Sequence, residues 1–212
     1  MKGLVIKDLY ILKGTIATTL TILTILIVYC LFRGYGIGLV IIPTLIFAAT
    51  TTSSLKLDWA VNWDKKALTM PINRKLIIQS KYLELVCLCV IGAIIGGISA
   101  NIQNMFTNAL SNYMILNFGL LSLALGIIGG SFHIMLVYKF GGKSLENSEI
   151  LLFVAYGISV GIMGIFIWGL KFVYIINFEA FSIVPIINLL ASIIISICNY
   201  KLTFISYAQK EL

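Results

Sequence analysis

Side chains able to do chemistry are scarce in this sequence, and the two that stand out interrupt long apolar runs. They are Glu84 and the single histidine, His133. Ionisable side chains at such positions are functional candidates, because burying a charge in an apolar solvent is costly. Each also has an ordinary explanation. Lys81, three residues from Glu84, can pair with it or extend to water, and a neutral histidine can hydrogen-bond to a neighbouring helix.

Catalytic and metal-binding patterns are otherwise missing from the sequence. No G-x-x-x-x-G-K-[ST] phosphate loop occurs, so we expect no ATPase activity in this chain. The histidine has no acidic partner nearby, which argues against a metalloprotease, and no series of acids is present to relay protons. The cysteines lack disulfide or zinc-site spacing, and we interpret them as small buried apolar residues (Cys30, Cys87, Cys89 and Cys198). We therefore expect no catalytic residue, metal or cofactor here.

The composition indicates that lipid, rather than water, surrounds most of the chain. Of its 212 residues, 60% are hydrophobic and 11% are charged, and the mean hydropathy is +1.05. Soluble domains carry about 25% charged residues. The net charge of +7 does not indicate nucleic-acid binding, because the basic residues lie at the ends of apolar segments rather than on one polar face.

Six apolar segments are long enough to cross a bilayer, which needs roughly 20 apolar residues per helix. They cover residues 15–32, 37–53, 82–100, 113–138, 150–170 and 182–200. Backbone polar groups in lipid must be paired within their own segment, so these segments are predicted to be helices. The predicted fold is an all-α polytopic membrane protein with one transmembrane domain. The first segment lacks an A-x-A cleavage site, and we interpret it as a retained helix.

The basic residues predict the orientation of these six helices. Of the 15 lysines and arginines, only Arg33 and Lys171 follow an odd-numbered helix. Lysine and arginine are concentrated on the cytoplasmic side of membrane proteins. Both termini and the segment 54–81 are therefore predicted to be cytoplasmic, and so one-sided a distribution also supports an even number of spans.

Small and hydroxyl-bearing residues recur within the predicted spans. Three G-x-x-x-G pairs occur at the spacing that lets helix backbones approach closely, either within one bundle or at a dimer interface (Gly92 with Gly96, Gly126 with Gly130, Gly157 with Gly161). The first two spans are rich in threonine. Thr18 and Thr50 are candidates to line a polar path, although a threonine hydroxyl can equally bond to the preceding turn of its own helix.

The segment 54–81 is longer than a turn between two helices requires. Apolar residues recur in it every three or four positions, which predicts one face of an amphipathic helix (Trp59, Ala60, Trp63, Ala67 and Met70). Pro71 should end that helix, and Asn73 can cap a second helix that runs through Lys81 into the third span. Two interpretations stay open: a helix whose tryptophans lie at the lipid headgroups, or a docking element for a soluble partner.

The run from Ala67 to Leu83, ALTMPINRKLIIQSKYL, resembles the segment between helices 2 and 3 of small type-2 ABC exporter permeases. Residues 1–14 resemble the amphipathic elbow helix at the N-terminus of that family, and Ser206–Leu212 is similar to its basic tail. The resemblance covers essentially the whole chain. Within the family, the chain is most similar in character to bacterial permeases that export phenol-soluble modulins, which are amphipathic peptides.

The resemblance implies a division of labour with other chains. It implies a separate ABC ATPase in two copies, which binds the ATP and magnesium, and a second permease chain that forms a homodimer in the bacterial plasma membrane. It implies export of an amphipathic peptide or lipid-like molecule, for which Thr18, Thr50, Glu84 and His133 are path candidates. It also implies a coupling helix over residues 58–70 that docks on the ATPase, with these residues at the contact: Asp58, Trp59, Trp63, Asp64, Lys65, Lys66, Ala67, Leu68, Met70 and Pro71. The alternatives are a carrier or channel without an ATPase, and an immunity or assembly protein that transports nothing.

Overall fold

The computed structural model describes residues 2–69, 73–107, 110–140, 148–173 and 183–208, and these residues form helices and short connections without any strand. The helices are α1 (Lys2–Ile11), α2 (Lys13–Arg33), α3 (Gly36–Ala60), α4 (Trp63–Leu68), α5 (Arg74–Thr107), α6 (Asn112–Phe140), α8 (Ser148–Val173) and α9 (Ile183–Ala208). The prediction of an all-α polytopic chain is confirmed for this described part.

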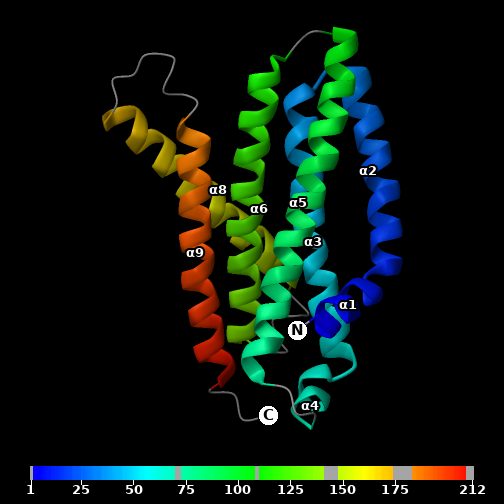
Figure 1. Cartoon of the computed structure of the whole chain (residues 1–212), viewed down its shortest axis with the longest axis vertical. Coiled ribbons are helices and arrows are strands. Elements are labelled where there is room, and N and C mark those ends of the chain that lie inside the picture. The colour runs from blue at the N-terminus through cyan, green and yellow to red at the C-terminus, as the bar shows by residue number, and fades with distance from the viewer. Residues whose placement is uncertain (1, 70–72, 108–109, 141–147, 174–182, 209–212) are drawn as a thin grey trace.

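The long helices form one bundle in which α3 and α5 lie at the centre (Figure 1). α2 packs along one side of α3, and α6 packs against α3 and α5 on the other side. α9 and α8 contact mainly α6, and α8 runs obliquely to the other helices (Figure 1). α1, α4 and the C-terminal end of α9 all lie at the same end of the bundle, which we call its base.

Five of the described helices are long and apolar enough to cross a membrane, namely α2, α3, α5, α6 and α9. The sixth predicted span, 150–170, corresponds to α8, whose described apolar part is the shorter stretch Glu149–Ile165. The count of six therefore stays a prediction. Two helices also extend beyond the predicted apolar limits toward the base: α3 continues to Ala60, and α5 already begins at Arg74.

Close contact between α3 and α5 depends on two glycines of α5. A Cβ atom on Gly92 would lie 2.7 Å from Thr44 Cα, and one on Gly96 would lie 2.6 Å from the Val40 carbonyl oxygen. Any larger residue would have to push the two backbones apart. α3 contains Pro43, which cannot donate to the Leu39 carbonyl four residues earlier.

The other two glycine pairs behave differently from each other. Gly126 and Gly130 of α6 pack against Cys89 and Leu85 of α5, so this pair also serves packing within the bundle. A Cβ atom added to Gly157 or Gly161 of α8 would have no described atom of another residue within 4 Å. The third pair thus faces outward from this single chain.

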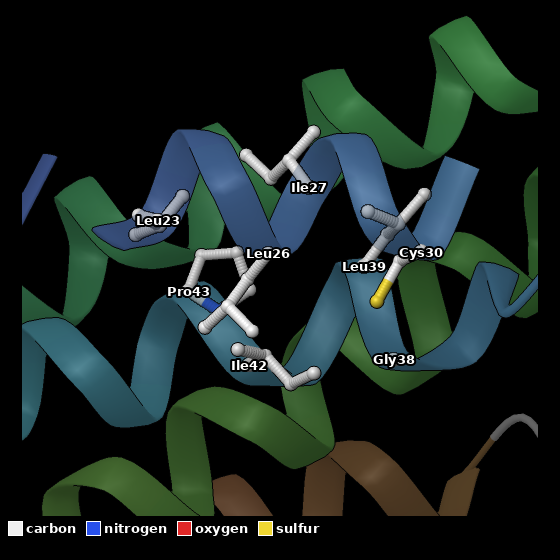
Figure 2. A pocket seen from close by; sticks show the side chains of 8 residues that line it. All are labelled: Leu23, Leu26, Ile27, Cys30, Gly38, Leu39, Ile42 and Pro43. Carbon is white, nitrogen blue, oxygen red and sulfur yellow. The ribbon is translucent and has the colours of Figure 1, made fainter. Parts of the chain in front are cut away.

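A small void lies between α2 and α3 beside Pro43, as Figure 2 shows. Its volume is about 10 Å³, and it is bordered by Leu23, Leu26, Ile27, Cys30, Gly38, Leu39, Ile42 and Pro43. A void of this size holds one water at most, and water needs polar partners that these side chains do not offer. We interpret it as a dry packing defect rather than a ligand site.

Candidate functional site: a charged junction of α1, α3, α4 and α5

Lys81 of α5 is buried at the base of the bundle among side chains from two other helices. Its Nζ atom lies 2.9 Å from Asp8 Oδ1 of α1 and 2.6 Å from Asp58 Oδ2 of α3. The same atom donates a hydrogen bond of 2.6 Å to Ser54 Oγ, also of α3. One ammonium group thereby joins three helices that are far apart in the sequence.

Glu84 lies one turn along α5 from Lys81 and is completely buried. Its Oε2 atom accepts a hydrogen bond of 3.0 Å from Ser54 Oγ and lies 3.6 Å from Lys81 Nζ. Of the two alternatives left open for Lys81, pairing with Glu84 or extending to water, the structure contains the pairing. Ionic and hydrogen-bond partners within the chain therefore account for the position of this carboxylate, and its role in a substrate path stays a prediction.

Lys7 of α1 is the second cation of the cluster. Its Nζ atom lies 2.8 Å from Asp58 Oδ1 and 3.0 Å from Asp8 Oδ1. It also lies 4.0 Å from the centroid of the Trp63 ring, at the first residue of α4. A cation over an aromatic face is attracted to it by about 0.5–2 kcal/mol. We call the set Lys7, Asp8, Ser54, Asp58, Trp63, Lys81 and Glu84 the charged junction.

The electrostatics of the charged junction make its parts interdependent. Two ammonium groups are shared among three carboxyl groups, and Asp8, Lys81 and Glu84 are almost wholly inaccessible to water. Removing one partner from a buried ion pair costs about 3–5 kcal/mol, because the remaining charge loses its compensation. Helices α1, α3 and α5 are consequently held in one relative position while the charges stay paired, and α4 is attached to them through the contact of Trp63 with Lys7.

The structure corrects the predicted amphipathic helix over residues 58–70. Helix α3 continues through Asp58 and ends at Ala60, and the short helix α4 begins only at Trp63. The break occurs because Asn62 adopts a left-handed backbone conformation with φ of 51°, which asparagine tolerates better than most residues. Since a helix-like periodicity continues across this turn, the sequence pattern could not locate the break.

Asp58 lies in the last turns of α3 rather than in a separate docking helix. We expected Asp58 at the contact with the ATPase, but it is buried at the end of α3 and paired with both lysines of the junction. The carboxylate is therefore an internal ligand of Lys7 and Lys81 and does not face a partner.

The other predicted docking residues differ in how far they are exposed. Trp59 is 46% exposed, Lys66 is exposed, Trp63 is half-buried against Lys7, and Ala67 is buried. Asp64, Lys65 and Leu68 belong to α4 by their backbone, but their side chains are outside the described set, as are Met70 and Pro71 altogether. Docking by any of these residues stays a prediction.

The predicted second helix is confirmed at its start. Asn73 Oδ1 accepts a hydrogen bond of 3.1 Å from the Lys75 backbone N–H, and α5 begins at Arg74. This is the side-chain cap expected of asparagine before the first helical turn. As predicted, α5 then runs without interruption through Lys81 into the membrane-spanning region.

The remaining path candidates lie on three different helices. Thr18 is exposed on α2 and donates to the Thr15 carbonyl at 2.8 Å, while Thr50 is buried on α3 and donates to the Phe47 carbonyl at 2.7 Å. Both hydroxyls therefore bond within their own helices, as the ordinary interpretation expects. His133 is buried on α6. Their role in a substrate path stays a prediction.

A second polar cluster joins α5, α6 and α9. Tyr82 Oη lies 2.9 Å from Thr203 Oγ1, and Asn199 Nδ2 donates to Ser131 Oγ at 3.0 Å. The rings of Tyr82 and Tyr200 meet edge to face at 5.6 Å between centroids. Within the described residues, no group of histidine, cysteine, aspartate and glutamate is placed to hold a metal ion.

Comparison with known proteins assigns the chain to a family. The model of the family described as ABC-2 family transporter protein matches residues 3–209, nearly the full length of the chain. No curated protein and no solved structure matches the sequence significantly. A match of this extent, together with several helices able to cross a membrane, shows that the chain is a multi-pass membrane protein of the ABC-2 transporter family, with the character of an ABC-type permease.

Proposed function

We propose that this chain is the membrane subunit of an exporter driven by a separate ABC ATPase that docks on the base of the bundle. The observation that supports the proposal most is the charged junction. It connects the segment predicted to dock, from Trp59 through α4, to the buried ends of α3 and α5. ATP and magnesium would bind to the partner ATPase, and this chain would hydrolyse nothing itself.

The docking surface would centre on the turn between α3 and α4. Three large apolar side chains are exposed in this short stretch, Leu57, Trp59 and Val61, and the exposed Lys66 lies beyond them on α4. Exposed apolar residues that gather near one turn are typical of a surface that a protein partner or the headgroup layer covers. Tryptophan is among the residues that contribute most to protein interfaces, so we expect Trp59 to be the main anchor.

Movement of α4 would reach the membrane through Lys7. The Trp63 ring holds the Lys7 ammonium, and Lys7 in turn binds Asp58 at the end of α3. Asp58 and Asp8 share Lys81 with α5. A partner that shifts α4 would therefore pull on α1, α3 and α5 together, as a rigid-body transition requires.

A second copy of the chain would complete the transporter as a homodimer. α8 presents Gly157 and Gly161 outward with no described atom near them, and Ile158 and Val160 beside them are exposed. Small residues at this spacing allow a helix of another chain to approach closely in lipid. We propose this face of α8 as part of the contact between the two copies.

The cargo we propose is an amphipathic peptide or lipid-like molecule moved outward across a bacterial plasma membrane, with both termini in the cytoplasm. The resemblance to exporters of phenol-soluble modulins supports this cargo. The uneven distribution of lysine and arginine supports the orientation. Two ATPase copies would serve the two permease copies.

The docking proposal is tested by purifying the chain with its partner from cells. Trp59→Ala should lower the amount of copurified ATPase at least tenfold, because a central buried tryptophan contributes about 2 kcal/mol or more to an interface. Tyr113→Ala, which truncates an exposed aromatic residue at the start of α6 and at the opposite end of the bundle, is the matched control and should leave the amount of copurified ATPase unchanged. Unchanged association in Trp59→Ala together with normal coupled ATP turnover would contradict the docking site. Transport by the purified chain in vesicles without nucleotide would indicate a carrier instead.

A further inference from the structure

Two consecutive residues of α5, Lys81 and Tyr82, bind different groups of helices near the base of the bundle. Lys81 binds carboxylates of α1 and α3 in the charged junction. Tyr82 belongs to the second polar cluster and reaches α9, where its Oη atom lies 2.9 Å from Thr203 Oγ1. Successive residues of an α-helix point about 100° apart, so one turn of α5 can hold partners on two sides. The charged junction and α9 are thus joined through a single turn of α5.

The hydrogen bonds beyond Tyr82 run in one consistent direction. Thr203 Oγ1 donates its proton to the Asn199 carbonyl at 2.8 Å, so it accepts the bond from Tyr82 Oη. Asn199 Nδ2 donates to Ser131 Oγ of α6 at 3.0 Å, and Ser131 Oγ donates to the Ile128 carbonyl at 2.9 Å. The phenol group of Tyr82 is therefore the donor at the start of a series of bonds that passes through α9 into α6.

The contact between Tyr82 and α9 is packed as well as hydrogen-bonded. The rings of Tyr82 and Tyr200 meet edge to face, with 5.6 Å between their centroids and 86° between their planes. Thr203 and Asn199 are both buried. Water does not readily replace a hydrogen bond at such a place, and the low local dielectric constant strengthens it. We therefore expect the bond to hold when α5 shifts, rather than to be exchanged for water.

Helix α9 belongs mainly to α6 and meets α5 near the base. In Figure 1, α5 and α9 converge toward the base and diverge toward the opposite end of the bundle. A further edge-to-face pair attaches α9 to α6, with 5.3 Å between the ring centroids of Tyr138 and Tyr207. Contact with Tyr82 is consequently a local attachment of α5 to a helix that otherwise packs along α6.

We propose that Tyr82 is a positioning residue that carries movement of the charged junction to α9. The inference rests on the proposed function, because the movement is the one that a bound ATPase would cause. When α1 and α4 pull on Lys81, the same turn of α5 displaces Tyr82, and its bond to Thr203 draws the base of α9 along. Without that bond, α9 would stay with α6. The moving unit then includes α9 as well as α1, α3 and α5.

The first test compares variants that each remove one hydroxyl group, in the purified complex of the chain with its ATPase. Tyr82→Phe and Thr203→Val both remove the bond. Each should lower the stimulation of ATP turnover about fivefold, which corresponds to about 1 kcal/mol, the net contribution of one hydrogen bond. The double variant should lose no more than either single variant, because the bond is then already absent.

Tyr200→Phe is the matched control for these variants. It removes a hydroxyl group from the ring that contacts Tyr82, and this group has no hydrogen-bond partner within the part of the chain that the structure describes. Stimulation of ATP turnover should therefore stay at the wild-type level. Thr203→Val leaves the pair of tyrosine rings intact, so it tests the bond even if Tyr82→Phe does not fold. Equal copurification of the ATPase in all variants shows that docking is unaltered.

The second test measures movement of α9 directly. Spin labels are attached to cysteines that replace the exposed residues Ile150 of α8 and Ile205 of α9, in a chain whose four native cysteines are replaced by alanine. In the complex, a non-hydrolysable ATP analogue should change the distance between the labels. Tyr82→Phe should reduce that change at least twofold, whereas Tyr200→Phe should leave it as it is.

The outcomes separate this inference from the proposed function. A wild-type chain that binds no ATPase would overturn both. Normal stimulation of ATP turnover, or normal movement of the labels, in Tyr82→Phe with its ATPase bound would overturn the role of Tyr82 alone. Equal losses in Tyr82→Phe and Tyr200→Phe would also overturn it, because packing of the rings rather than the hydrogen bond would then account for the effect.

Discussion

Replacing Lys81 by methionine removes the charge at the centre of the junction and keeps a side chain of similar length. In the native chain the Lys81 Nζ atom compensates Asp8 at 2.9 Å, Asp58 at 2.6 Å and Glu84 at 3.6 Å. Lys7 reaches Asp8 and Asp58, so those two carboxylates would keep one cation, while Glu84 would keep only its hydrogen bond from Ser54. Breaking a buried pair in this way should cost about 3–5 kcal/mol.

The assay is thermal unfolding of the purified chain in a mild detergent, followed by circular dichroism. For a chain of about this length, a destabilisation of 1 kcal/mol lowers the melting temperature by roughly 2–4 °C, so Lys81→Met should lower it by roughly 6–20 °C. Lys56→Met is the matched control, because Lys56 pairs with the exposed Glu149 at 3.4 Å and exposed pairs contribute about 0–1 kcal/mol. The double variant Lys81→Met with Asp58→Asn should recover part of the loss. A shift for Lys81→Met no larger than that of Lys56→Met would show that Lys81 does not stabilise the bundle through these ion pairs.

The remaining predictions concern helix packing and the link to α4. Gly96→Ala should destabilise the chain by about 1–3 kcal/mol in the same assay, because its Cβ would press on the α3 backbone, whereas Gly97→Ala, with no described atom within 4 Å, should not. Equal effects of the two variants would contradict the packing account. Lys7→Met and Trp63→Leu should show a coupling of about 0.5–2 kcal/mol in a double-mutant cycle, as expected of a cation over a ring at 4.0 Å. Strictly additive effects would argue that α1 and α4 are not linked through this contact.

Much of the fold follows from sequence patterns because lipid imposes a simple rule. Long apolar runs must be helices, so α2, α3, α5, α6 and α9 were predictable in kind and approximate position. The ends of α3 and α5 at the base were harder to predict. The apolar pattern stops near Ser53 and begins again at Tyr82, yet α3 continues to Ala60 and α5 starts at Arg74. Hydropathy cannot detect these extensions, because there the helices are polar and are stabilised by one another's charges.

The charged junction was predictable only where its partners share one helix. The spacing of Lys81 and Glu84 indicated a pair, and the structure contains it. Asp8 lies 73 positions before Lys81 in the sequence, and no local pattern signals a contact between residues so far apart. Asp58 misled the prediction for the same reason, since its place in an apparent amphipathic helix suggested exposure. In the structure it belongs to α3 and is paired with Lys7 of α1 and Lys81 of α5.

We propose that the charged junction transmits the action of an ATPase to the membrane helices. The most direct test is to measure ATP turnover of the purified complex for the wild type and Lys81→Met, after copurification shows equal amounts of ATPase in both. We expect the ATPase to stay bound to the variant, because Trp59 is unaltered, and the stimulation of ATP turnover by the permease to be lost. Turnover equal to that of the wild type, or a wild-type chain that retains no ATPase at all, would rule out this role of the junction.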